Sequence, residues 1–452
     1  MSNIPSDFVN DIAYAFWNIN ADGTIITGDS WADTDKRFTD NTSVSPPDSW
    51  NDTNSTFFGN FGQFKKLRDQ GKQINISLAI GGWSWSKNFS PAMSTSTTRT
   101  NLVTGILNTF RKYPIFTGVS IDWEYPSNDN INYGLDGNTT NSQDCDNFIL
   151  FLQQLRSAFD ANGMVNYIIA MCCTAAPDKC KWPVEQIHPL INQLQIMSYD
   201  MHDGSWGETV SAFHTNPRKS SFGKYSCEEA ADYYLSRGVP SLKIFIGGAL
   251  YSRGYSGTKG PGSQATGGSP DMSWEKGIVD YKKLPLQGAT EYNDPESKAA
   301  YSYDSQKQIL NTYDNNISII EKCKIIYEKN LGGIILWDNS SDKSIDDPRN
   351  ITKTLYDNLT HGTPNLTPVQ PPNPTPIVPT PTPTPNPTPT PTPNPMPIVP
   401  MPTPTPNPTP IVPMPTPMPN CQCKCMTTKM INISFDVNIS SGNITNGKFI
   451  LN

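Results

Sequence analysis

The chain has 452 residues, a formal net charge of −7 at pH 7 and a charged fraction of only 17%. This mild acidity argues against a nucleic-acid-binding protein, which needs a basic face, and fits an uncharged partner. No run of about 20 apolar residues predicts a membrane span, and Met1–Pro5 lacks the charged start and apolar run of a signal peptide.

Apolar runs that end at polar or glycine-rich turns alternate with helical patterns along the chain. The strand-like runs lie near 11–17, 74–80, 115–124, 165–174, 193–199, 243–249 and 332–337. The helical candidates lie near 61–70, 95–112, 144–161, 227–237 and 317–330. Such alternation predicts an α/β fold with a parallel sheet and crossover helices. Eight such units close a TIM (β/α)8 barrel, whose active site lies at the carboxyl ends of the strands.

The strand predicted at 115–124 carries two carboxylates close together. Alternation along a strand would place Ser120, Asp122 and Glu124 on one face. A buried carboxylate is costly unless it is paired or neutralised. Two on one face therefore indicate either a salt-bridged pair or an acid/base catalytic site, and the spacing alone does not decide between them.

Six short motifs occur in the order in which glycoside hydrolase family 18, the chitinases, carries them. In the family signature D-x-x-D-x-D-x-E, Asp122 and Glu124 match the last two positions, whereas Thr117 and Ser120 replace the first two. The other five motifs are Ala13-Tyr14-Ala15-Phe16, Ile80-Gly81-Gly82-Trp83, Met197-Ser198-Tyr199-Asp200, Tyr251-Ser252-Arg253-Gly254 and Gly332-Gly333-Ile334-Ile335-Leu336-Trp337. The chain therefore resembles this family over residues 7–357.

The resemblance implies a retaining hydrolysis in which the substrate's own N-acetyl group attacks, so that the usual second catalytic carboxylate is not needed. Glu124 would be the general acid and later the base, with its pKa raised by the like charge of Asp122. Asp122 would hold the acetamido N–H, Tyr199 the acetamido oxygen and Asp200 the substrate near the scissile linkage. The resemblance implies no cofactor and no metal.

The resemblance also implies a binding surface of aromatic side chains. Trp337 would be the apolar floor under the reacting sugar, with Met197 packed beside the site. The other substrate-binding candidates are Phe16, Trp83, Trp206, Tyr251 and Arg253. Core or rim packing is the alternative for each aromatic residue.

Ser120 departs from the family signature at a position where the family has a carboxylate that shares a proton with the Asp122 position. A hydroxyl cannot hold that charge. We therefore expect Asp122 and Glu124 to titrate lower, so that the pH optimum shifts or the rate falls. Thr117 replaces an Asp that is mainly structural in the family.

The predicted barrel is one strand short of eight. The family's first strand lies well upstream of its YAF motif, which begins here at Ala13. We interpret the sequence as incomplete at the N-terminus or as starting at an internal methionine. The alternative is a seven-strand barrel left open, with exposed edges that invite aggregation.

Composition divides the rest of the chain. Residues 1–362 form the predicted catalytic barrel, and 255–329 form a small α+β insertion between its seventh and eighth strands. The insertion's strands are expected at 279–282, 289–292 and 300–303. Residues 363–419 are a Pro/Thr-rich linker, which is expected to be extended because proline forbids helix and sheet ladders.

The short tail 420–452 has too few residues for a core of its own, although Met430 to Val437 alternates like a strand. Its cysteines, Cys421, Cys423 and Cys425, lack the paired spacing of a zinc site. Among the six other cysteines, Cys172 and Cys180 could bridge a loop. The adjacent pair Cys172-Cys173 on an apolar run more often means small buried side chains.

The expected function is a monomeric chitinase that acts on chitin or chito-oligosaccharides, outside the cell, although this chain shows no signal peptide. A carbohydrate-binding lectin is the first alternative: Ser120 and the missing strand favour it, and Glu124 argues against it. An endo-β-N-acetylglucosaminidase acting on N-glycans is the second, but the insertion and the aromatic series favour a long linear substrate. A structural or adhesive stalk protein is the third.

Overall fold

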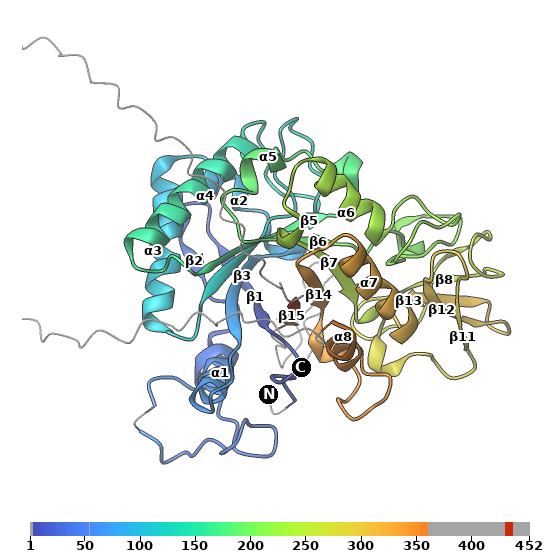
Figure 1. Cartoon of the computed structure of the whole chain (residues 1–452), viewed down its shortest axis with the longest axis horizontal. Coiled ribbons are helices and arrows are strands. Elements are labelled where there is room, and N and C mark those ends of the chain that lie inside the picture. Colours follow the sequence, from blue (N-terminus) through green and yellow to red (C-terminus); the bar gives the residue numbers. More distant parts are fainter. Residues whose placement is uncertain (1–2, 54, 360–429, 437–452) are drawn as a thin grey trace, which may run out of the picture. The chain divides into compact units, whose positions relative to one another are not determined.

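The computed structural model describes residues 3–53, 55–359 and 430–436. Eight parallel strands form a closed ring (Figure 1), because the row β15-β14-β7-β6-β5-β4-β3-β1 closes through a pairing of β1 with β15. The ring strands are β1 (Asp11–Ile19), β3 (Asn75–Gly81), β4 (Gly118–Asp122), β5 (Ile168–Thr174), β6 (Gln193–Met197), β7 (Ile244–Ala249), β14 (Gly333–Trp337) and β15 (Met430–Asp436). The short β2 (Ile25–Ile26) pairs antiparallel with the end of β1. The predicted TIM barrel is confirmed.

The eighth strand comes from the tail of the chain. All seven barrel strands predicted from the sequence are present, and β15 lies in the remaining place, paired in parallel with both β14 and β1. The alternative of an open seven-strand barrel is therefore wrong, because the ring has no free edge. The strand expected from the alternation after Met430 is confirmed.

Within the described residues, eight α-helices accompany the strands. They are α1 (Gly59–Asp69), α2 (Phe89–Met93), α3 (Ser96–Lys112), α4 (Asp144–Ala161), α5 (Val184–Ile187), α6 (Cys227–Ser236), α7 (Asn316–Glu328) and α8 (Ile351–Leu359). Shorter helical turns span Trp31–Asp35, Trp83–Trp85, Pro177–Lys179, Gly204–Trp206, Ser241–Lys243, Tyr281–Lys283 and Asn339–Ser341. The five predicted helices are all present, and capping boxes at Thr95 and Asn315 start α3 and α7.

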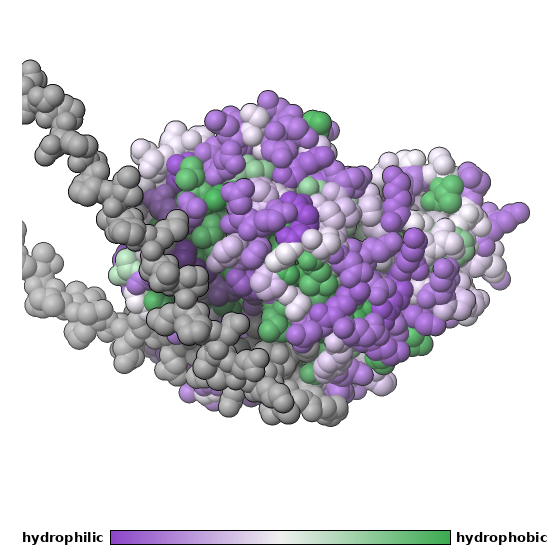
Figure 2. Space-filling model, turned by 45° about the horizontal axis from the view of Figure 1, so that its top comes forward, coloured by the Kyte–Doolittle hydropathy of each residue, from purple (hydrophilic) through white to green (hydrophobic). Residues whose placement is uncertain are grey.

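The main core lies between the ring and its helices. Strands such as β3 are buried along almost their whole length, as parallel strands covered on both faces must be. On α3, Leu102, Ile106 and Phe110 recur every fourth residue and are all at most 2% exposed, so one stripe of the helix faces the core. Figure 2 shows a mostly hydrophilic surface in which hydrophobic residues form small separate groups.

An antiparallel sheet follows β7, in the order β10-β8-β13-β12-β11, with β9 on β8. Its strands are β8 (Tyr251–Ser256), β9 (Gly267–Gly268), β10 (Ile278–Asp280), β11 (Thr290–Asn293), β12 (Ala300–Asp304) and β13 (Ile309–Tyr313). The three predicted strands are present. The sheet starts earlier than the expected 255–329 and ends before α7, because β8 follows β7 almost directly and α7 is the crossover helix to β14.

No helix in the described part of the chain is long and apolar enough to cross a membrane. Six cysteines in the barrel and insertion are free thiols, among them Cys172 and Cys180, so the loop bridge is absent there. Cys173 is buried as expected, whereas Cys172 is only partly buried. The predicted linker 363–419 and the cysteines of the tail lie outside the described residues.

Candidate active site

The two carboxylates of the signature lie at the carboxyl end of β4. Asp122 is 5% exposed and Glu124 is 8% exposed. The Glu124 N–H donates to Ser86 Oγ at 2.9 Å, and Asn138 Nδ2 donates to the Glu124 carbonyl at 3.2 Å. Contacts from two loops therefore fix the backbone that carries Glu124.

Tyr125 contacts the Glu124 carboxylate, and sequence reasoning missed it. Its hydroxyl makes a side-chain hydrogen bond with Glu124, and burial, followed by the negative charges of Glu124 and Asp122, raises the pKa of Tyr125 well above its usual value. Strand alternation would place neighbours on opposite faces, but β4 ends at Asp122. The rule therefore does not apply to Tyr125, and its place in the motif was the available signal.

Asp200 follows β6 and is held by groups from three directions. Tyr251 Oη donates to Asp200 Oδ1 at 2.6 Å, and Arg253 Nε donates to the same oxygen at 2.8 Å. The Asp200 N–H donates to His214 Nδ1 at 3.3 Å. Burial opposes ionisation, but the Arg253 charge and these hydrogen bonds lower the pKa of Asp200 below its ordinary value. Asp200 is therefore a carboxylate at neutral pH.

Arg253 pairs closely with two carboxylates, Asp200 and Asp203, and a third, Glu275, lies 3.9 Å away. Its Nη1 donates to Asp203 Oδ2 at 2.7 Å, and its guanidinium lies 5.0 Å from the centre of the Trp206 ring. Burial raises the pKa of Asp203 even though Arg253 lies beside it. Asp203 was missed from the sequence, because nothing local connects it to an arginine fifty residues away.

Tyr199 brings β6 into the same site as β4. Burial raises the pKa of its phenol well above the usual value, and the nearby Cys172, Asp122, Asp200 and Glu124 groups raise it further. The four predicted catalytic residues therefore lie within electrostatic range of one another.

Trp337, at the end of β14, joins two apolar clusters. It packs against Ala13, Ala15 and Ala79 inside the barrel and also against a cluster formed by Ala249, Tyr251 and Ile278. Its ring stacks on Phe16 with centroids 5.4 Å apart and planes 27° apart. Small side chains therefore surround the stacked rings of Phe16, within β1, and Trp337, at the end of β14.

The remaining predicted residues lie around this centre. Met197 ends β6 and is partly buried. Trp83, in the turn after β3, is 36% exposed, and Trp206, in the turn after β6, is 53% exposed, so both rings reach the surface. Trp274 was not predicted, although it packs against Tyr251 with ring centroids 6.4 Å apart.

Comparison with known proteins agrees with this geometry. The sequence model described as "Glycosyl hydrolases family 18" matches residues 1–342. The chain belongs to this family. Endochitinase 1 of Metarhizium robertsii is 31% identical over 76% of this chain and 77% of its own length. Chitinase 1 of Aphanocladium album is 32% identical over 76% and 78%. The solved catalytic domain of a psychrophilic chitinase B from Arthrobacter TAD20 superimposes with a TM-score of 0.68 at 26% identity, over 78% of this chain and 95% of that one.

Ser120, where this family 18 chain departs from the signature, belongs to a chain of amides inside the barrel. Its Oγ donates to Gln195 Oε1 at 3.1 Å, and Gln195 Nε2 donates to Gln193 Oε1 at 2.9 Å. Gln193 Nε2 then donates to Asp11 Oδ2 at 3.2 Å. Burial raises the pKa of Asp11 to about 6, although hydrogen bonds from Asn75 and Gln193 oppose the rise.

Thr117, the other departure, links two neighbouring strands. The Ile76 N–H of β3 donates to Thr117 Oγ1 at 3.0 Å, and Thr117 is fully buried. A hydroxyl in this place satisfies a buried backbone donor. This contact fits the structural role expected for the position.

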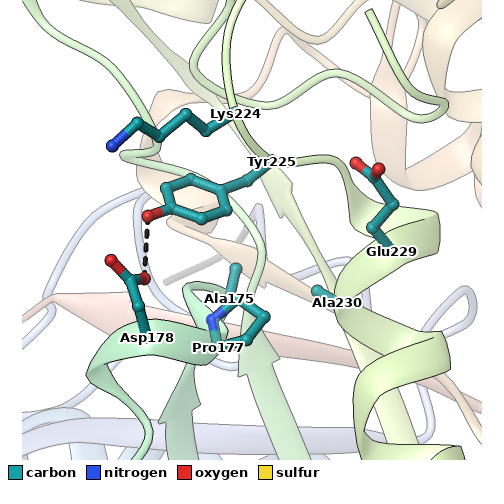
Figure 3. Close-up of a pocket in the computed structure, with 7 residues that line it drawn as sticks. All are labelled: Ala175, Pro177, Asp178, Lys224, Tyr225, Glu229 and Ala230. Atoms are coloured by element: carbon teal, nitrogen blue, oxygen red, sulfur yellow. Dashed lines mark hydrogen bonds between the residues drawn. The ribbon is translucent and has the colours of Figure 1, made fainter.

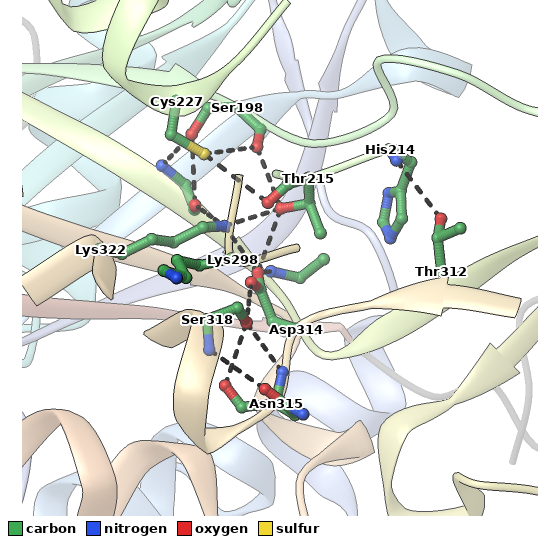
Figure 4. Close-up of polar contacts among 12 residues, drawn as sticks. Ser198, His214, Thr215, Cys227, Lys298, Thr312, Asp314, Asn315, Ser318 and Lys322 are labelled. Carbon is green, nitrogen blue, oxygen red and sulfur yellow. Dashed lines mark hydrogen bonds and ion pairs between the residues drawn. The ribbon is translucent and has the colours of Figure 1, made fainter. Parts of the chain in front are cut away.

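A fully buried ion pair lies behind the end of β6 (Figure 4). Lys322 Nζ contacts Asp314 Oδ2 at 2.6 Å and donates to Thr215 Oγ1 at 2.7 Å and to the Gly247 carbonyl at 2.8 Å. Thr215 Oγ1 also donates to the Ser198 carbonyl at 3.1 Å. The pair therefore ties α7 and β7 to the segment that carries Tyr199 and Asp200 in this family 18 site.

A pocket of about 450 Å³ lies beside the end of β5 (Figure 3). Its lining residues are Ala175, Pro177, Asp178, Lys224, Tyr225, Glu229 and Ala230. Tyr225 Oη donates to Asp178 Oδ1 at 2.8 Å across it. None of the predicted site residues lines this pocket, so it is a neighbour of the cluster at the strand ends and not its centre.

Proposed function

We propose that this family 18 hydrolase is a chitinase that cleaves β-1,4 linkages between N-acetylglucosamine units in chitin or chito-oligosaccharides. The observation that carries the proposal is the grouping of Asp122, Glu124 and Tyr199 at the ends of β4 and β6, with Tyr199 and the Trp337 ring packed against the same apolar cluster. Both curated relatives named above are chitinases by name, which supports the same substrate class.

In the first step Glu124 would give its proton to the glycosidic oxygen as the bond from that oxygen to the anomeric carbon breaks. The acetamido oxygen of the same sugar would attack the anomeric carbon and form a cyclic oxazolinium ion. Asp122 would accept the acetamido N–H and stabilise the positive charge, and Tyr199 would donate to the acetamido oxygen. Positioned charges and donors of this kind act strongly in a site from which water is excluded.

In the second step water would attack the anomeric carbon from the side that the leaving group vacated. Glu124, now ionised, would take a proton from that water, and the oxazolinium ring would open. Two inversions give net retention of configuration. Asp200, held ionised by Arg253, would bind the substrate near the scissile linkage, and Trp337 with Phe16 would support the apolar face of the sugar.

Hydrolysis of a fluorogenic chitotriose analogue by the full chain tests the proposal. We expect turnover by the native protein and its loss in Glu124→Gln, which keeps the shape and removes the acid. Glu296→Gln, on an exposed loop of the insertion, is the matched control and should keep the native rate. A Glu124→Gln variant as active as the native protein would contradict the assignment.

A lectin is the second candidate, because Ser120 gives its hydrogen bond to Gln195 where the family has a carboxylate. Sedimentation with insoluble chitin separates the two: binding without turnover in the native protein would favour the lectin. We also infer an extracellular monomer, since chitin is a polymer outside cells. Size-exclusion chromatography with light scattering checks the monomer, and cell fractionation checks the location.

A further inference from the structure

The strand that closes the barrel is encoded far from the rest of it. β15 lies between β14 and β1 (Figure 1), with Gly333–Leu336 paired to Met430–Ile433 and Asp11–Ala15 paired to Asn432–Asp436. The preceding ring strand, β14, ends at Trp337, and α8 and the stretch 360–429 lie between it and β15 in the sequence.

We propose that residues 430–436 are a built-in closing strand, which docks between β1 and β14 of its own chain and completes the catalytic barrel. Without it, both neighbours would expose a row of unpaired backbone N–H and C=O groups, and such edges template aggregation. A barrel removes its edges only when the ring is complete. The gap between β1 and β14 is therefore a β-augmentation site, and the strand that binds there is the chain's own tail.

The residue pattern of the tail suits the observed register. Ile433 pairs with Ile12 and Leu336, which are both fully buried in the main core outside the ring. Ser434 pairs with Ala13, which belongs to the small cluster inside the barrel. Apolar residues of the tail thus pair with residues of the main core, and polar residues of the tail pair with residues of the barrel interior.

The same parity holds along the rest of the strand. Phe435 pairs with Tyr14 of the main core, whereas Asp436 pairs with Ala15 of the inner cluster. A slip of one residue would exchange the two sets, because the side-chain period of a strand is two. The sequence pattern therefore argues against a slip of one residue.

The place of β15 connects the tail to the candidate active site. Its two neighbours carry the stacked rings of the floor, Phe16 within β1 and Trp337 at the end of β14. The strand between them sets how far apart β1 and β14 stand. Docking of the tail should therefore be needed for a complete floor and not only for stability.

The tail's attachment favours docking within one chain. The described residues on both sides of the stretch 360–429 belong to one compact unit. A linked strand meets its site at an effective concentration far above that of free chains, and longer linkers lower it only gradually. A tail from a second copy would compete at a disadvantage in dilute solution.

The test cuts the linker of the full chain. A specific protease site is placed within 380–400, and the cut protein is run on a size-exclusion column. We expect the fragment with residues 430–436 to co-elute with the barrel at the size of one chain. In Ile433→Asp, which puts a charge level with two fully buried residues, the fragment should separate. Ile444→Asp, outside β15, is the matched control and should stay bound.

Hydrogen exchange on the uncut chain gives a second measurement, which does not depend on enzymatic activity. The amides of 431–436 should be protected, and Ile433→Asp should abolish that protection. Rapid exchange in the native tail, or a fragment that leaves while the barrel keeps its unfolding midpoint, would overturn the proposal. Tails exchanged between copies in a dimer would also overturn it. Absence of chitotriose turnover alone would count against the proposed function and not against the closing strand.

Discussion

Two regions of the barrel bury carboxylates in opposite ways. On the side of the insertion, Asp200 and Asp314 each contact a buried cation, Arg253 and Lys322. In the barrel interior, Asp11 is held by amides alone. The pKa of Asp200 is lowered, whereas burial raises the pKa of Asp11 to about 6. Asp200 has a cation beside it and a side chain that is 35% exposed, whereas Asp11 is 4% exposed and is held by amides, so both the partner and the lesser burial favour the lower pKa of Asp200.

This difference assigns the two regions different tasks. The cation-paired side can hold fixed negative charge beside a substrate, and it locks the segment with Tyr199 and Asp200 in place. The amide-paired side connects Ser120 of β4 to Asp11 through the neutral amides of Gln195 and Gln193. The contrast is testable. Removal of a cation should leave a buried carboxylate without its partner, whereas neutralising the amide-bound carboxyl group should remove a buried charge.

The largest effect is expected from Lys322→Met. Lys322 and Asp314 are both fully buried, and breaking a buried ion pair by removing one partner costs about 3–5 kcal/mol. Urea unfolding of the full chain measures the loss. Lys324→Met is the matched control on the same helix, since its pair with Glu321 has a lysine that is 58% exposed, and it should cost less than about 1 kcal/mol.

A double variant sharpens this prediction. Asp314→Asn combined with Lys322→Met removes both charges and should regain part of the lost stability, because the destabilised group is the unpaired carboxylate. If the single and double variants unfold at the same urea concentration, the charge of Asp314 is not what Lys322 compensates.

Arg253→Met should have the next largest effect. It would leave Asp200 and Asp203 without their cation, and stability should fall by about 3 kcal/mol, less than for Lys322 because the Asp200 side chain is 35% exposed. Chitotriose turnover should fall at least tenfold. Arg237→Met, whose partner Glu185 is 49% exposed, is the control. An equal effect of both arginines on turnover would show that Arg253 does not hold Asp200.

The strands and motifs of the fold could be predicted from the sequence, whereas many contacts within the site could not. The ring strands are recognisable in the sequence as apolar runs, and the site motifs lie within a few residues of their ends. Long-range partners carry no such signal: Gln195 reaches Ser120 across 75 positions, and Asp203 reaches Arg253 across 50. β15 was visible as a strand but not as a barrel strand, because local alternation does not say which edge a strand joins.

Asp11→Asn should change the pH dependence of stability. The pKa of Asp11 is 3.8 when unfolded and about 6 when folded, so its favourable contribution is complete below pH 4 and is lost as the pH rises to 6. The loss amounts to at most about 3 kcal/mol. Asp11→Asn should therefore flatten the decline between pH 4 and 7 in thermal unfolding curves. A difference between native and variant curves that does not change with pH would refute this.

Ser120→Asp should give the smallest effect and the most specific one. The native hydroxyl donates to Gln195, whose amide continues the chain to Asp11. An aspartate at this position cannot donate when ionised, so it would either share a proton with Asp122 or turn the Gln195 amide around. Either way it adds negative charge beneath Glu124, which should hold its proton to higher pH. We expect the pH optimum of chitotriose hydrolysis to rise by about one unit.

Ser120→Asn is the matched control, because it has the same shape as Ser120→Asp without the charge, and it should leave the pH optimum in place. Identical pH profiles for the two variants would mean that Ser120 does not set the charge balance of the site.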